Sequence, residues 1–282
     1  MVAAMTSAGA TTSINRRPRV SPTLISRWLT WIYVTLVVIF LLTPIVVIIL
    51  ASLTSTSYLS VPPRGLSLRW FEAVLNSPSY RAAIASSLTL ACASTIGATC
   101  MGTIVAYGLA RYRPYGAQVL GALFSAPLII PGVVSGVALL QFLTMSGWRG
   151  GFLPLVALHV LMGLPYVIRS VSASIASADP QLEEAAWTLG SSAVKTFFLV
   201  TLPIIKPGVV TGAVFAFIIS MGEVAATIFV LTVRQTTLPV KIFSMVEFGV
   251  DPSIAAVSAM MIFVTAILLL VAEKWTGFHR FA

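Results

Sequence analysis

Charged residues are scarce in this chain. They make up 9% of its 282 residues, and only eight are Asp or Glu, while 58% of the residues are hydrophobic. The mean hydropathy is +0.99, and such a composition is typical of a protein that lies in a lipid bilayer. The net charge of +9 does not indicate nucleic-acid binding, because no basic stripe interleaved with aromatic residues is present.

Other features are missing as well. The sequence has no G-x-x-x-x-G-K-[ST] motif, so it lacks a phosphate-cradling loop of that type for ATP. It has two cysteines, Cys92 and Cys100, which lie on one expected helix about 12 Å apart along its axis and cannot form a disulfide with each other. No internal repeat is visible, and a substrate path at an interface between repeats or subunits would therefore require a second subunit.

Long apolar stretches dominate what is present. A hydrocarbon core of about 30 Å requires roughly 20 helical residues, and six stretches reach that length; five contain no charged residue, and the other contains only Glu223. Because lipid cannot satisfy backbone polar groups, these stretches predict an all-α protein with six transmembrane helices rather than a β-barrel. The expected spans are Trp28–Leu53, Ala82–Ala110, Tyr115–Trp148, Gly150–Ile168, Pro207–Val233 and Pro252–Ala272.

The basic residues predict how the chain is oriented. If the N-terminus is cytoplasmic, eleven Lys and Arg residues lie at cytoplasmic ends and six lie in outer loops. Basic residues near spans tend to stay inside, so both termini are expected in the cytoplasm. Residues 1–27 are rich in Ser, Thr and Ala and are interpreted as a disordered cytoplasmic tail, since the following apolar run is too long for a cleaved signal. Residues 28–282 then form one membrane domain, with a cytoplasmic loop at 176–206.

That cytoplasmic loop has the signals of two helices. Asp179-Pro180 is a helix start, because Asp can cap free amides and Pro suits the first helical position. Gly190 can adopt the left-handed conformation that ends the helix, and Ser191 or Ser192 can cap a second one. Pro203, followed by Pro207, is expected to stop the second helix before the next span.

The first of these helices is expected to carry charges beside an apolar strip, a surface that suits a groove on a soluble partner. The charged residues are Glu183 and Glu184, and the apolar strip consists of Leu182, Ala186 and Leu189.

The loop also resembles a known motif. It is similar to the EAA loop of ATP-binding-cassette importer permeases, with Val where Ile is usual. The matching pattern is Glu184-Ala185-Ala186, then three residues, Gly190, nine further residues and Val200-x-Leu202-Pro203. The resemblance extends over roughly residues 60 to 272 and implies the type I importer permease fold. It also implies that the first helix is a coupling helix that docks in a cleft of a cytoplasmic ATPase. The residues assigned to this coupling are Glu183, Glu184, Ala185, Ala186, Gly190, Leu202 and Pro203.

The resemblance carries expectations about partners and location. The chain would be a multi-pass protein of the bacterial inner membrane and would hold no cofactor, because ATP and Mg are bound by the ATPase. The expected partners are a second permease subunit, two ATPase subunits and an extracytoplasmic substrate-binding protein. The second permease is expected to be homologous, as in relatives that work as heterodimers, and an identical partner stays open.

The segment Leu238–Pro252 resembles the last outer loop of spermidine/putrescine-type permeases, specifically their second permease subunit. This implies a polyamine substrate or a related amine, opine or aminophosphonate. Gly222-Glu223 stands where the polyamine pattern has two adjacent acids, and Gly-Glu also occurs in oxyanion permeases. A permease for an inorganic oxyanion or ferric iron is therefore an alternative, and an ion-coupled secondary transporter is an alternative from another class.

Glu223 is the only formal charge in the centre of an expected span, and because burying a charge is costly, it is a candidate for the substrate path. Its alternatives are a structural pair with a neighbouring donor or a neutral acid. Pro131, with Pro127, indicates either a broken helix that lines a cavity or a simple kink. His159 is interpreted as hydrogen-bonded packing rather than a relay group. The candidate path residues are Glu223, Gly222, Thr227 and Pro131.

Overall fold

A computed structural model describes residues 24–148, 150–232, 235–249 and 251–276 of the chain. The prediction of a disordered tail over residues 1–27 lies outside the described residues as far as residue 23, and over residues 24–27 it is wrong, because these residues begin helix α1. The chain divides into two compact units, residues 1–46 and 47–282. The described part of the first unit belongs to helix α1, which runs over Leu24–Ser52.

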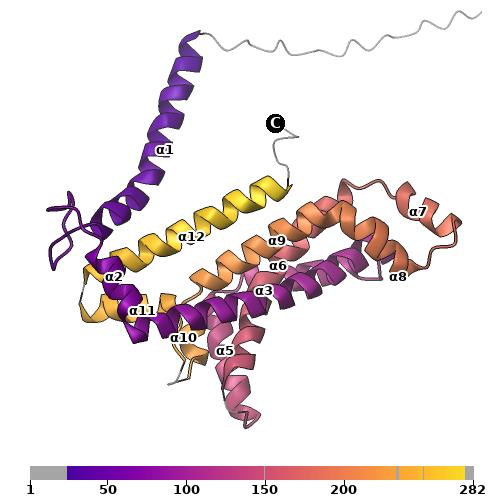
Figure 1. Cartoon of the computed structure of the whole chain (residues 1–282). Coiled ribbons are helices and arrows are strands. Elements are labelled where there is room, and N and C mark those ends of the chain that lie inside the picture. The colour runs from indigo at the N-terminus through magenta and orange to yellow at the C-terminus, as the bar shows by residue number, and fades with distance from the viewer. Residues whose placement is uncertain (1–23, 149, 233–234, 250, 277–282) are drawn as a thin grey trace, which may run out of the picture. The chain divides into compact units, whose positions relative to one another are not determined.

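The described residues are helical almost throughout, as predicted, and their only β-type pairing is an isolated bridge between Thr54 and Leu66. Figure 1 shows the helices. The long ones are α1, α3 (Pro78–Tyr112), α6 (Phe152–Ala176), α9 (Leu202–Gly222) and α12 (Pro252–Thr276). The short ones are α2 (Arg69–Asn76), α4 (Ala117–Ser125), η1 (Ala126–Leu128), α5 (Gly132–Met145), α7 (Gln181–Thr188), α8 (Ala193–Thr196), η2 (Phe197–Thr201), α10 (Thr227–Val230) and α11 (Leu238–Phe248).

Within the described residues, five helices are long and apolar enough to cross a membrane, and a bent pair makes a sixth. The bent pair consists of Ala117–Leu128 and Gly132–Met145, which meet at 99°. It replaces the single helix expected over Tyr115–Trp148. The break falls before Pro131, which lacks an N–H and disfavours helical geometry in the residue that precedes it. The structure therefore has a break at this proline rather than a simple kink, and the expectation that the break lines a cavity stays a prediction.

The fifth span differs from its predicted range. It was expected over Pro207–Val233, and the structure places it over Ala193–Gly222. The expectation that Pro203 and Pro207 end a separate helix is wrong, because α8, η2 and α9 follow one another without interruption. The segment η2 is a π-helical turn that ends at Thr201, two residues before Pro203, and its altered hydrogen-bond pattern accommodates a residue that has no N–H to donate.

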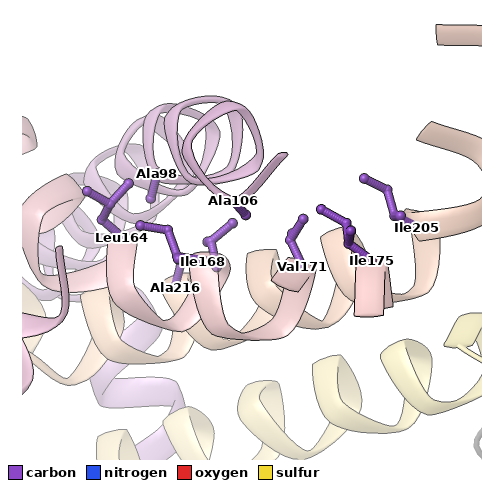
Figure 2. Close-up of a cluster of buried hydrophobic side chains, with 9 residues drawn as sticks. Ala98, Ala106, Leu164, Ile168, Val171, Ile175, Ile205 and Ala216 are labelled. Atoms are coloured by element: carbon purple, nitrogen blue, oxygen red, sulfur yellow. The ribbon is translucent and has the colours of Figure 1, made fainter. Parts of the chain in front are cut away.

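The core of the second unit lies where α3, α6 and α9 pack against one another. Figure 2 shows the buried apolar cluster between them. Small residues on α3 allow the close approach: a Cβ at Gly102 would lie 2.7 Å from the Val167 side chain on α6. Cys92 and Cys100 are unpaired and exposed, which confirms that they do not bridge. The cluster consists of Ala98, Ala106, Leu164, Val167, Ile168, Val171, Ile175, Ile205 and Ala216.

Candidate coupling and translocation sites

Helix α7 begins and ends as the sequence predicts. At its start, the Asp179 carboxylate accepts the N–H of Gln181 at 2.9 Å. At its end, Gly190 has a φ of +85°, the left-handed conformation that favours glycine. The N–H of Ser191 donates to the carbonyl of Ala186 at 3.0 Å, which satisfies a carbonyl of the last turn. The turn between the two helices is thus built from local bonds.

The second helix of the loop is the beginning of a span rather than a separate element. Ser192 caps it by accepting the N–H of Lys195 at 3.4 Å. The chain then continues through η2 into α9, where Leu202 is half-buried against the core cluster and Pro203 is exposed. The loop is therefore joined to the fifth span by continuous helix.

Glu183 is buried, with 4% of its surface exposed. Its Oε1 accepts hydrogen bonds from Arg111 at the end of α3, at 3.0 Å from Nη2 and 3.2 Å from Nε. The same oxygen accepts the Thr201 hydroxyl of η2 at 2.9 Å. The expectation that Glu183 lies on the docking surface is wrong, because this carboxylate joins α7 to α3 and to the fifth span. Sequence reasoning missed Arg111, whose only signal was a basic residue at the end of a span.

The rest of α7 faces away from the chain, since Glu183 is its only buried residue. Leu182 is 48% exposed and Leu189, just after the helix, is 89% exposed. Glu184 and Ala185 are exposed, and Ala186 is half-buried. The helix therefore presents an acid beside an apolar strip, and no described part of this chain covers that strip.

The candidate path residues lie at a second break in the helices. Glu223 was expected in the centre of a span, but α9 ends at Gly222 and Glu223 is extended, with ψ of 118°. Its Oε1 accepts the N–H of Ala226 at 2.7 Å, so the side chain stabilises the turn that precedes the short helix α10. Glu223 is half-buried and has no ion-pair partner among the described residues.

The two helix breaks meet. A Cβ at Gly132, the first residue of α5, would lie 3.3 Å from Oε1 of Glu223. A Cβ at Gly136, one turn later, would lie 2.5 Å from the carbonyl oxygen of Ala226, so only glycine permits this approach. Pro131 lies at the break before α5, and Gly222 and Glu223 lie at the neighbouring break after α9.

Thr227 is placed differently from the other path candidates. It is fully buried, and its hydroxyl donates to the backbone carbonyl of Glu223 at 3.0 Å. It also lies 3.0 Å from Nε2 of His159, whose Nδ1 is 2.8 Å from the Ser220 hydroxyl. Thr227 therefore links the turn at Glu223 to His159 by hydrogen bonds. The interpretation of His159 as hydrogen-bonded packing is confirmed.

No group of three or more His, Cys, Asp and Glu side chains that could hold a metal ion occurs in the part of the chain that the structure describes. The breaks instead bring together backbone turns, glycines and one carboxylate.

Among the described residues, five long apolar helices with one bent pair, a loop with an exposed helix and two meeting helix breaks fit a membrane permease of the ATP-binding-cassette importer class. The chain belongs to the family described as the inner membrane component of binding-protein-dependent transport systems, whose family model matches residues 98–276.

Among named relatives, the chain is similar to the putrescine transport system permease protein PotI of Escherichia coli (strain K12). The two are 33% identical over 230 residues, which cover 79% of this chain and 82% of PotI. The spermidine/putrescine transport system permease protein PotC of the same organism is 29% identical over 250 residues, 89% and 94% of the two chains. The molybdenum transport system permease protein ModB of Haemophilus influenzae is 33% identical over 208 residues, 68% and 91% of the two chains.

The fold is that of solved importers. The chain superposes with a TM-score of 0.69 on a bacterial ATP-binding-cassette transporter that imports alginate, at 16% identity, covering 90% of this chain and 98% of the other.

Family membership has three consequences. The chain is a subunit of the inner membrane, it is a transporter subunit rather than an enzyme, and ATP hydrolysis belongs to a separate ATPase. The type I importer permease fold expected from the sequence is confirmed. The alternative of an ion-coupled secondary transporter is thereby set aside.

Proposed function

We propose that this chain forms half of the translocation path for a small organic cation of the polyamine type. One observation carries the proposal: Glu223 is a half-buried carboxylate, without a basic partner among the described residues, at the point where the breaks before α5 and after α9 meet. The relatives named for putrescine and spermidine transport support it.

The electrostatics of this position favour a cation. A carboxylate removed from bulk water attracts an ammonium group and repels an anion, and its own desolvation costs less when a cation is near. Glu223 also lies beside Gly132, the first residue of α5. The N-terminal end of a helix carries partial positive charge, which lowers the energetic cost of a negative charge there.

The relative named for molybdenum transport supports a second candidate, an inorganic oxyanion. An oxyanion would be repelled by Glu223, so the two candidates predict opposite effects of neutralising this side chain.

The partners follow from the same proposal. Helix α7 docks in a groove of the ATPase through Glu184 and its exposed apolar strip, while Gly190, Leu202 and Pro203 shape the turn and the start of the span behind it. A complete transporter contains a second, homologous permease, two ATPase subunits that bind ATP and Mg, and an extracytoplasmic substrate-binding protein. Residues 1–27 form a cytoplasmic tail ahead of a permease domain at 28–282, whose coupling loop is 176–206.

The test uses the complete transporter in lipid vesicles, with ATP-driven uptake of labelled putrescine and, separately, of molybdate. We expect Glu223→Gln to lower putrescine uptake about tenfold, because one hydrogen bond to a charged group is lost. Glu223→Asp should lower uptake less. The amount of assembled complex should be unchanged in both variants. Glu72→Gln, at an exposed acid of α2, is the matched control for removing one negative charge.

Uptake is divided by the amount of assembled complex in the same preparations. Equal losses of uptake and assembly would show that Glu223 is only structural. If the wild type takes up no putrescine and Glu223→Gln increases molybdate uptake, the oxyanion candidate would replace the polyamine proposal.

A further inference from the structure

We infer that His159 is a positioning residue for the substrate path, because its imidazole joins the two sides of the break at Glu223. The inference rests on the proposed role of Glu223 and deepens it. His159 is 1% exposed and lies on α6. Its two ring nitrogens bond Ser220 in the last turn of α9 and Thr227, the first residue of α10.

The donors and acceptors of this network fix its direction. The Thr227 hydroxyl donates its proton to the carbonyl of Glu223, so it can only accept from Nε2 of His159. The ring then carries its proton on Nε2, and Nδ1 accepts from the Ser220 hydroxyl. Each hydroxyl donates once, and the chain of bonds ends on the backbone of Glu223.

The network also reaches the second span. The Ser94 hydroxyl of α3 lies 3.0 Å from the Ser220 hydroxyl, and it is shared with the Leu90 carbonyl at 2.8 Å. Three helices of the core, α3, α6 and α9, therefore meet in one buried polar chain. Its members are polar groups that would be costly to bury without partners, and all of them have partners.

The surroundings show what the imidazole does beyond filling space. Leu158 and Met162, on the helix of His159, and Ala226 and Val230, beside Thr227, belong to one buried apolar cluster. Only a side chain with polar atoms at both ring positions can bond both sides of the break. Because the carbonyl of Ala226 lies against Gly136, a change in the turn also moves it relative to α5.

The position of the turn can be measured without knowing the substrate. A Cβ at Gly132 would lie 3.4 Å from Cβ of Ala225, close to the separation in a disulfide. In a chain with Cys92 and Cys100 replaced by Ala, the pair Gly132→Cys and Ala225→Cys should form a disulfide when the turn is in place. Its rate of formation in the complete transporter is followed by the loss of maleimide labelling.

Three substitutions of His159 separate bonding from packing. The amide nitrogen of Gln can occupy the position of Nε2 and bond Thr227, whereas the amide of Asn reaches only the position of Nδ1. We expect His159→Asn and His159→Leu, which lose the bond to Thr227, to lower the cross-linking rate about tenfold, as expected for the loss of a buried hydrogen bond. His159→Gln, which keeps that bond and loses the one to Ser220, should lower the rate less. Equal rates in all three variants and the wild type would overturn the inference.

Thr227→Val provides a second variant that keeps the volume of the site, in case His159→Leu does not assemble. It should lower the cross-linking rate as His159→Leu does. Thr144→Val is its control, because the Thr144 hydroxyl bonds only the Leu140 carbonyl of its own helix. An unchanged rate in Thr227→Val would contradict the role of the bond across the break.

Putrescine uptake by the same variants connects the turn to transport. We expect His159→Leu and His159→Asn to raise KM about tenfold with a smaller change in kcat, and His159→Gln to raise KM less, since the turn positions the binding carboxylate. A change in cross-linking with an unchanged KM would refute the positioning role. Absence of putrescine uptake in the wild type would instead count against the proposed substrate, and the cross-linking result would stand.

Discussion

Adjacent glutamates in the coupling loop have different environments. Glu183 is buried against Arg111, whose side chain is 21% exposed, while Glu184 is exposed. We expect Glu183→Gln to lower the free energy of unfolding by about 2 to 3 kcal/mol, because it leaves a mostly buried guanidinium without its partner. Glu184→Gln should leave stability unchanged and weaken ATPase binding. Thermal unfolding of the purified chain in detergent, with co-purification of the ATPase, measures both effects.

The double variant Glu183→Gln with Arg111→Met is the control for this pair. It should be less destabilised than the sum of the single variants, since it removes both charges together. If Glu183→Gln unfolds at the wild-type temperature, the buried ion pair does not hold α7 to the core.

Gly190 allows backbone strain to be tested without a steric clash. Its φ is +85°, and a Cβ there would have nothing within 4 Å, so a side chain would fit in the space but would strain the backbone. Gly190→Val should destabilise the turn by about 1 to 2 kcal/mol and weaken co-purification of the ATPase, because a β-branched residue disfavours positive φ. Gly190→Asn should be milder, since Asn tolerates this conformation. Identical behaviour of the two variants would show that backbone strain is not the cause.

The helices α5 and α10 meet through glycine. Adding a methyl group at Gly136 places it 2.5 Å from the carbonyl oxygen of Ala226, so Gly136→Ala should push the two breaks apart and cost about 1 to 3 kcal/mol. We expect transport to fall more than assembly does. Gly108→Ala on α3, where a Cβ would meet nothing within 4 Å, is the control and should be neutral. Normal transport by Gly136→Ala would mean that the close approach of the two breaks is not required for transport.

The sequence predicted the number of spans because apolar length alone decides whether a helix can cross lipid. It also predicted the turn at Gly190, since the local signals of that turn lie within a few residues. It misplaced the end of the fifth span because Glu223 is stabilised by a turn and by the neighbouring α5, contacts that no hydropathy window contains. The burial of Glu183 likewise depends on Arg111, which lies 72 residues away in the sequence.

The orientation of the whole molecule is expected from its eleven-to-six distribution of basic residues. In chains that lack Cys92 and Cys100, single cysteines at residues 15, 112, 190 and 278 should be protected from an impermeant thiol reagent in intact cells. Cysteines at residues 64 and 236 should react, because these positions are expected in outer loops. Permeabilised cells provide the control for intrinsic reactivity. Labelling of residue 190 from outside would refute the cytoplasmic location of the coupling loop.

Helix α7 has eight residues and buries one side chain, Glu183, within its own chain. Isolated helices shorter than about 12 to 15 residues are marginal in water, so the bonds of Glu183 to Arg111 and Thr201 and the two caps hold this helix only weakly in the chain alone. If α7 docks on the ATPase as proposed, docking would also be a folding step. We expect amide hydrogens of α7 to exchange rapidly in the purified permease and slowly in the assembled transporter, as hydrogen exchange with mass spectrometry can show. The free energy of docking would include the cost of ordering α7, so any variant that loosens the helix would weaken ATPase binding without touching the interface.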